Sequence, residues 1–84
     1  MSTTMRAKMK LMTVSRTETC DVMTFMCVSA KSYPTDGIHE DNTFSKFSPS
    51  GELKINVTNP ALLGHIQPGE TFYVDFSPVP ADKL

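Results

Sequence analysis

The fold is decided by residues 40–79, which read EDNTFSKFSPSGELKINVTNPALLGHIQPGETFYVDFSPV. Two segments of this stretch, Gly51–Thr58 and Thr71–Ser77, alternate apolar with polar residues. The apolar members are Leu53, Ile55 and Val57 in the first segment and Phe72, Val74 and Phe76 in the second. A period of two is expected of a strand with one buried face. Both segments therefore predict strands of a small sheet.

Two turn signals lie between these strands. In Asn59–Gly64 (NPALLG) the asparagine can cap a helical turn, the proline fits its first position, and the glycine can end it in a left-handed conformation. In Gln67–Glu70 (QPGE) the proline presets φ at the second turn position, and the glycine accepts a positive φ at the third. We therefore expect one short helical turn and one tight turn before the last strand.

Three further strands are predicted upstream, because β-forming residues and alternation recur there. They are Arg6–Val14, Val22–Lys31 and Thr43–Phe47. Five strands with a helical turn between the fourth and the fifth are typical of SH3-like small barrels. The predicted fold is therefore all-β, a small five-stranded antiparallel barrel, with a short sandwich as the alternative.

The chain has 84 residues, which is enough for one domain with one small core. We expect a flexible leader at residues 1–5, a single β domain at 6–77 and an extended tail at 78–84. The tail is set apart because Pro78 and Pro80 end the last strand. A domain of this size gains stability from self-association, so a homo-oligomer is expected.

Charge and hydropathy narrow the range of partners. The formal net charge is −1, which provides no general attraction for nucleic acid or for anionic membranes. No apolar run reaches the length that a membrane-spanning helix needs. We therefore expect neither a membrane nor a nucleic acid as the partner, and place the protein in the cytoplasm of the cell that makes it.

Residue types that support catalysis or metal binding are sparse. Acidic residues and a histidine gather in one loop, but their spacing matches no known ligand pattern. The members are Asp36, His39, Glu40 and Asp41. Cys20 and Cys27 are seven positions apart, which fits neither a zinc site nor a redox pair, and the glycines are too dispersed for a phosphate loop. The sequence predicts no enzyme, no cofactor and no metal.

Binding is better supported than catalysis. Aromatic rings in the middle of the chain could stack on a base, and two lysines bracket the serine-containing turn at 48–51. The candidate binding residues are Tyr33, His39, Phe44, Lys46, Ser48, Ser50 and Lys54. The competing interpretation is that the phenylalanines pack in the core and that the lysines solvate strand faces or protect strand edges.

One set of motifs extends over most of the chain. It comprises E-D-N-T-F-x-K-F-x-P-S-G, then N-P-A-L-x-G, then P-G-x-x-F-Y-V-D-F, together with the early Met-Arg-Ala-Lys-Met-Lys stretch. In these motifs the chain resembles a group of short, mostly uncharacterised proteins encoded by tailed bacteriophages. The resemblance implies a small phage protein made in a bacterial cytoplasm, where cysteines stay reduced. It implies no activity and no functional residue.

Two functions compete within that context. The first is a virion-associated accessory subunit, such as a capsid-decorating or tail-associated protein, which binds other phage proteins. The second is an inhibitor of host defence that sequesters a small nucleotide signal or masks a host protein. Binding of single-stranded nucleic acid by a small barrel is a third candidate, which the net charge disfavours. Presence or absence in purified particles distinguishes the first from the second.

Overall fold

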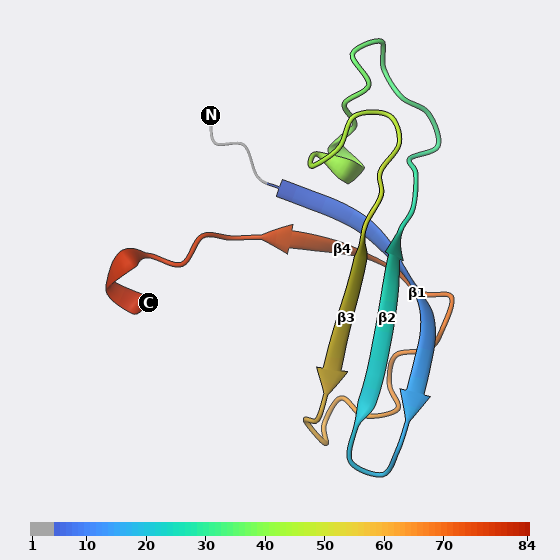
Figure 1. Cartoon of the computed structure of the whole chain (residues 1–84), viewed down its shortest axis with the longest axis vertical. Coiled ribbons are helices and arrows are strands. Elements are labelled where there is room, and N and C mark those ends of the chain that lie inside the picture. Colours follow the sequence, from blue (N-terminus) through green and yellow to red (C-terminus); the bar gives the residue numbers. More distant parts are fainter. Residues whose placement is uncertain (1–4) are drawn as a thin grey trace.

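The computed structural model describes residues 5–84, which form one antiparallel sheet with strand order β3-β2-β1-β4 (Figure 1). The strands are β1 (Met5–Arg16), β2 (Asp21–Cys27), β3 (Glu52–Val57) and β4 (Thr71–Phe76). Two short 3-10 turns, η1 (Glu40–Asn42) and η2 (Ala81–Lys83), are the other regular elements of this part of the chain. The predicted all-β class is confirmed.

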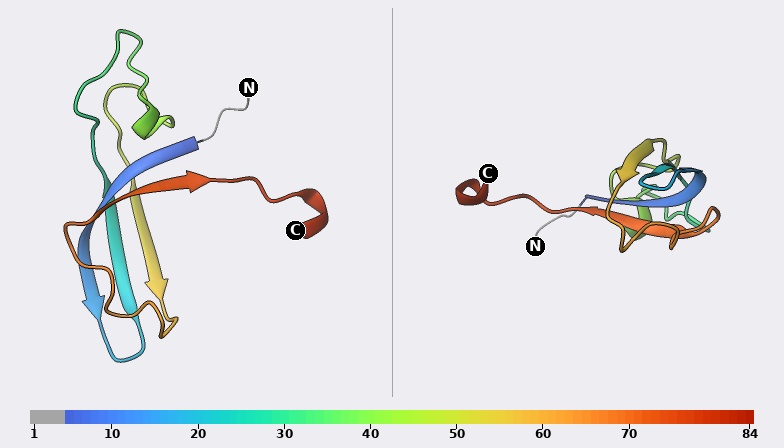
Figure 2. Two further views of the ribbon diagram at one scale, coloured as in Figure 1. Left: turned by 180° about the vertical axis from the view of Figure 1, so that it is seen from behind. Right: turned by 90° about the horizontal axis from the view of Figure 1, so that it is seen from below.

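Strand β1 shapes the whole sheet, because its two halves pair with different neighbours. Residues 5–10 pair with β4, whereas residues 9–16 pair with β2. The register of the β1–β2 pair shifts between Leu11 and Thr13, so Met12 lies in a β-bulge, which bends a strand and increases its twist. The sheet therefore curls, and β4 turns back across the face that β2 and β3 present (Figure 2).

The concave face of the curled sheet carries the core. Its most buried apolar side chains are Ala7, Met9, Leu11, Met23 and Phe25. The ring of Phe25 meets the ring of Phe72 edge to face across the fold, with 5.8 Å between centroids. Leu53, Val57, Phe72 and Val74 are partly buried against this core, as the period of two predicts. Ile55 shares that periodicity but is 44% exposed, because β3 is an edge strand.

The predicted strand at Thr43–Phe47 is wrong, because this segment forms turns. Local hydrogen bonds replace strand pairing there: Ser45 N donates to the Asn42 carbonyl at 3.1 Å, and Phe47 N donates to the Gly37 carbonyl at 2.8 Å. Phe47 also adopts a positive φ of 59°, which a strand cannot contain. The part of the chain that the structure describes therefore has four strands, and its sheet stays open between β3 and β4.

Other element boundaries also differ from the prediction. β1 begins at Met5 and continues to Arg16, while β2 ends at Cys27 and not at Lys31. The predicted leader falls on residues 1–4, outside the described residues, and on Met5, which belongs to β1. Strand β1 is longer than its apolar pattern because pairing with β2 continues past the bulge to Arg16.

The two turn segments before β4 show the predicted side-chain cap and positive φ values, but not the predicted helical turn. Asn59 Oδ1 accepts a hydrogen bond from Ala61 N at 3.1 Å, and Gly64 has a φ of 77°. The segment is a series of turns and not the helical turn expected. Gly69 has a φ of 98°, and Glu70 N closes the second turn on the Gln67 carbonyl at 3.3 Å.

Residues 77–84, which we call the arm, leave the end of β4 and extend away from the sheet (Figures 1 and 2). The backbone hydrogen bonds of η2, from Lys83 N to the Pro80 carbonyl and from Leu84 N to the Ala81 carbonyl, are internal to the arm. None of the described residues belongs to a helix that is long and apolar enough to span a membrane.

Candidate binding surface

The opening between β3 and β4 is an apolar groove of about 180 Å³, which we call the slot. Glu52 borders the slot, but its side chain alternates with that of Leu53 and lies on the other face of β3. The lining residues come from all four strands and from the loop before β3: Met5, Ala7, Met9, Cys27, Phe44, Gly51, Glu52, Leu53, Val74 and Phe76. The slot continues the concave core face, so it is apolar for the same reason as the core.

The outer end of the slot is exposed to solvent. Met5 and Phe76 are paired across β1 and β4, and their exposed fractions are 46% and 52%. Burial of a large apolar side chain is worth roughly 1.5–3 kcal/mol, and these two obtain only part of it in the single chain. Cys27 also lines the slot, and burial raises the pKa of its thiol. The slot is therefore open to solvent at the end that Met5 and Phe76 form.

Unpaired backbone groups border the slot on the β3 side. Cys27 N donates to the Gly51 carbonyl at 3.0 Å, so residues 51, 53, 55 and 57 direct their backbone groups toward β2 in the alternating pattern of an antiparallel pair. The backbone groups of Glu52, Lys54 and Asn56 then point outward. An extended segment lying in the slot would find a strand edge ready to pair.

One end of the slot is held in place by Asn42, which is only 1% exposed. Its Oδ1 accepts a hydrogen bond from Lys8 N at 3.0 Å, and its Nδ2 donates to the Val28 carbonyl at 3.1 Å. The side-chain amide therefore bridges β1 and the segment that follows β2, as a peptide group of a further strand would. Thr43 Oγ1 extends this bridging by accepting from Arg6 N at 2.8 Å.

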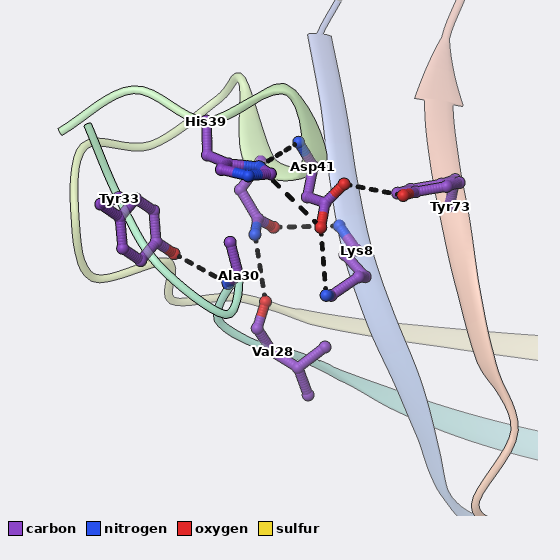
Figure 3. A network of polar contacts seen from close by, with 8 residues as sticks. Lys8, Val28, Ala30, Tyr33, His39, Asp41 and Tyr73 are labelled. Carbon is purple, nitrogen blue, oxygen red and sulfur yellow. Dashed lines mark hydrogen bonds and ion pairs between the residues drawn. The ribbon is translucent and has the colours of Figure 1, made fainter.

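Asp41 links the same loop to β4 (Figure 3). Its carboxylate accepts a hydrogen bond from the Tyr73 hydroxyl at 2.7 Å and pairs with Lys8 Nζ at 3.1 Å. These two contacts hold the pKa of Asp41 below its usual value, and the same hydrogen bond raises the pKa of Tyr73. His39 Nδ1 accepts from Asp41 N at 3.0 Å, so the imidazole serves the loop backbone.

A further ion pair ties β1 to β4 on the convex face. Arg6 donates to both carboxylate oxygens of Asp75, at 2.6 and 3.1 Å, and its guanidinium lies 4.3 Å from the centroid of the Tyr73 ring. The contact with Arg6 lowers the pKa of Asp75. Both charged groups are substantially exposed, so the pair aligns β4 on β1 more than it stabilises the fold.

The opposite end of the sheet is closed by Asp21, whose side chain is fully buried. It accepts a hydrogen bond from Gly64 N at 2.9 Å and pairs with Arg16 Nε at 3.0 Å. The Gly64 hydrogen bond, followed by the Arg16 contact, holds the pKa of Asp21 below its usual value. Arg16 Nη2 also donates to the Ile66 carbonyl at 3.0 Å, so the loop between β3 and β4 is fixed to the sheet.

The sequence-predicted binding residues do not form one site. Tyr33 and His39 meet in the long loop, with ring centroids 6.0 Å apart, and Phe47 approaches Tyr33 at the same distance. Phe44 enters the slot. The other four are exposed along the loop and on β3: Lys46, Ser48, Ser50 and Lys54.

The slot residues that the sequence missed are chiefly Met5, Cys27, Leu53 and Phe76. Alternation with polar neighbours indicated the face that Leu53 and Phe76 occupy, but nothing local indicated that this face stays uncovered. Within residues 5–84, no group of three or more histidine, cysteine, aspartate or glutamate side chains is arranged to hold a metal ion.

The slot has to be interpreted from its own geometry. No known protein family matches the chain, and no curated protein or solved structure is significantly similar to it.

Proposed function

We propose that this protein acts by binding and assembly and not by catalysis, as an accessory subunit of a larger particle. The observation that carries the proposal is the slot, an apolar groove bordered by the unpaired edge of β3 and closed by β4 on the other side. Exposed apolar grooves beside free strand edges are the surfaces on which proteins add an extended segment of a partner. In the context of the resemblance to tailed-phage proteins, the particle is the virion.

Binding in the slot would also complete the predicted barrel. The curled sheet has four strands, and the slot lies where a further strand would close it. A partner segment with alternating apolar residues would bury Phe76 and Met5 and pair with the outward backbone groups of β3. The fifth strand of the barrel is then supplied by the partner and not by residues 43–47.

The polar contacts support a binding role for the slot because they fix β4 and the long loop that contributes Phe44 to the slot. Asp41 and Asn42 hold the long loop against β1, and Asp75 holds β4 against β1. A preformed groove loses less conformational entropy when a partner binds. Asp41, the acidic side chain of the adjoining loop, is engaged in these structural contacts, with Tyr73 and Lys8.

The test is the composition of purified phage particles. We expect mass spectrometry to find the protein at a fixed copy number, and Phe76→Glu to remove it from the particles. Ile55→Glu is the matched control, because Ile55 is similarly exposed on an edge strand but does not line the slot. A protein confined to infected-cell lysate and missing from particles would contradict the assembly role.

A second candidate, the sequestering of a small nucleotide signal, has one observation in its favour. Tyr33, His39 and Phe47 form an aromatic cluster in the long loop, beside the exposed Lys46. Such a cluster could stack a base, with the lysine near a phosphate. Native mass spectrometry of the protein before and after denaturation tests this candidate: a released nucleotide would favour it, and a bare polypeptide would argue against it.

A further inference from the structure

We propose that the slot of each molecule is filled by the arm, residues 77–84, of a second copy, so that two chains exchange arms and close both barrels. This inference rests on the proposed function, since it uses the same slot. It names the partner that the slot takes first, before any other component of an assembly.

The single chain leaves large apolar side chains exposed at the slot and on the arm. Met5, Phe76 and Val79 have exposed fractions of 46%, 52% and 56%. Burial of a large apolar side chain is worth roughly 1.5–3 kcal/mol. A second copy that covers the slot and the arm would bury these side chains together.

The arm carries exposed apolar side chains on a restricted backbone. Its apolar side chains Val79 and Leu84 are 56% and 93% exposed, and the backbone hydrogen bonds of η2 are internal to the arm. Pro78 and Pro80 restrict the backbone before any partner is met, and Pro80 has the extended φ and ψ of −57° and 145°. A segment whose backbone the prolines already restrict loses less conformational entropy on binding.

Arm and slot are complementary in their apolar character. The slot is lined almost wholly by apolar side chains, and the arm carries the exposed side chains of Val79 and Leu84. The prolines lack N–H groups, which is tolerated in a segment that occupies a sheet edge. Side-chain burial would therefore supply most of the affinity.

The arm begins beside the outer end of the slot. It follows Phe76, which lines the outer end of the slot of its own molecule. A two-fold axis near Phe76 would bring the outer ends of two slots together, with each arm directed into the slot of the other copy. Residues 77–80, which precede η2, span about 12 Å when extended. The contact is then isologous, the commonest symmetry of soluble dimers.

The experiment measures the mass of the purified full-length chain in solution by light scattering and native mass spectrometry. We expect a dimer, and we expect Val79→Asp and Leu84→Asp each to raise the dimer dissociation constant at least about tenfold. Ile38→Asp is the control, because Ile38 is an exposed apolar residue of the long loop. Circular dichroism verifies that every variant keeps the sheet.

A mixing experiment tests the exchange itself. Val79→Asp has a damaged arm and an intact slot, whereas Phe76→Glu has a damaged slot and an intact arm. Each variant alone should be largely monomeric, and their mixture should recover a heterodimer through one intact arm and one intact slot. Failure of the mixture to associate while the unchanged protein dimerises would overturn arm exchange.

The outcomes separate this inference from the proposed function. A dimer that survives both arm variants but not Phe76→Glu overturns arm exchange in favour of direct packing of two slots against each other, and leaves the slot as a binding surface. A monomer at all accessible concentrations also overturns the inference, while incorporation into particles remains a separate measurement. Loss of particle incorporation in Phe76→Glu with an intact dimer would overturn arm exchange and support the slot as the surface that the particle binds.

Discussion

The two ends of the sheet are each closed by one buried polar side chain, and the two solutions differ in kind. At one end Asn42, a neutral amide, connects two backbone groups in the manner of a peptide of a neighbouring strand. At the other end Asp21, a carboxylate, binds the charged Arg16 and the amide of Gly64. A neutral side chain can therefore continue the hydrogen bonding of a sheet where a strand stops. A charged side chain that holds a loop makes the stability of the fold depend on pH.

The largest expected effect is on the charged end. Asp21→Ala should lower the melting temperature by more than about 10 °C, because it leaves Gly64 N and the Arg16 guanidinium without their partner. Thermal unfolding followed by circular dichroism measures this loss. Asp75→Ala is the control, since it breaks an exposed pair and should change the melting temperature by only a few degrees. Equal losses in the two variants would mean that the buried position of Asp21 is unimportant.

The neutral end should respond less strongly and more locally. Asn42→Ala leaves Lys8 N and the Val28 carbonyl unpaired, at a cost of about 1–3 kcal/mol. Hydrogen exchange should accelerate most at the Lys8 amide, while amides near Asp21 keep their protection. Asn56→Ala, at an exposed position of β3, serves as the control. Uniform acceleration across the sheet would show that the two ends unfold together.

The pH dependence should distinguish the ends further. The pKa of Asp21 is lowered in the folded state, so its contribution to stability is present above the unfolded pKa of about 3.9 and disappears as the pH falls through the folded value. Asp21→Asn should flatten the acid limb of the stability curve measured by urea titration. Asn42→Ala should shift the whole curve and keep its slope, because the amide does not titrate. A flattened slope in the Asn42 variant would contradict the expectation that only the charged end makes stability depend on pH.

The smallest expected effect comes from the outer contact of the neutral end. Tyr73→Phe removes the hydrogen bond that the Tyr73 hydroxyl donates to Asp41, in an exposed setting. We expect the melting temperature to fall by roughly 3 °C and the pKa of Asp41 to rise toward its usual value. Titration of the Asp41 carboxyl by nuclear magnetic resonance checks the second effect. An unchanged Asp41 pKa would show that Lys8 alone holds the carboxylate in its charged form.

Local patterns predicted the parts of this fold that depend on neighbouring residues. The alternation around Leu53 and Phe72 indicated β3 and β4, and the glycines at 64 and 69 adopt the positive φ that their turns required. The segment 43–47 was mistaken for a strand because five residues of alternation also occur in a loop. What folds that segment is the distant β1, through Asn42, and no local pattern reveals such a partner.

The candidate site was harder to predict than the fold. Period two identifies the face on which Phe76 lies, but the exposure of that face depends on the number of strands that close the sheet. Residues chosen for their chemical type, such as Lys46 and Ser48, lie on the surface of the long loop. The slot exists because β3 and β4 lie on either side of β1 and β2, an arrangement that the local sequence does not reveal.

The pairing of β1 with β4 has a consequence for the order of folding. The β1–β2 hairpin is closed by the short connection between Arg16 and Asp21, so it can form early. The β1–β4 ladder joins Met5 to Phe76 and must close a loop that contains almost the whole domain, which is entropically costly and slow. Both walls of the slot exist only after this last step. An incompletely folded chain would therefore carry apolar residues but no binding groove, so folding itself would control when the protein can engage a partner.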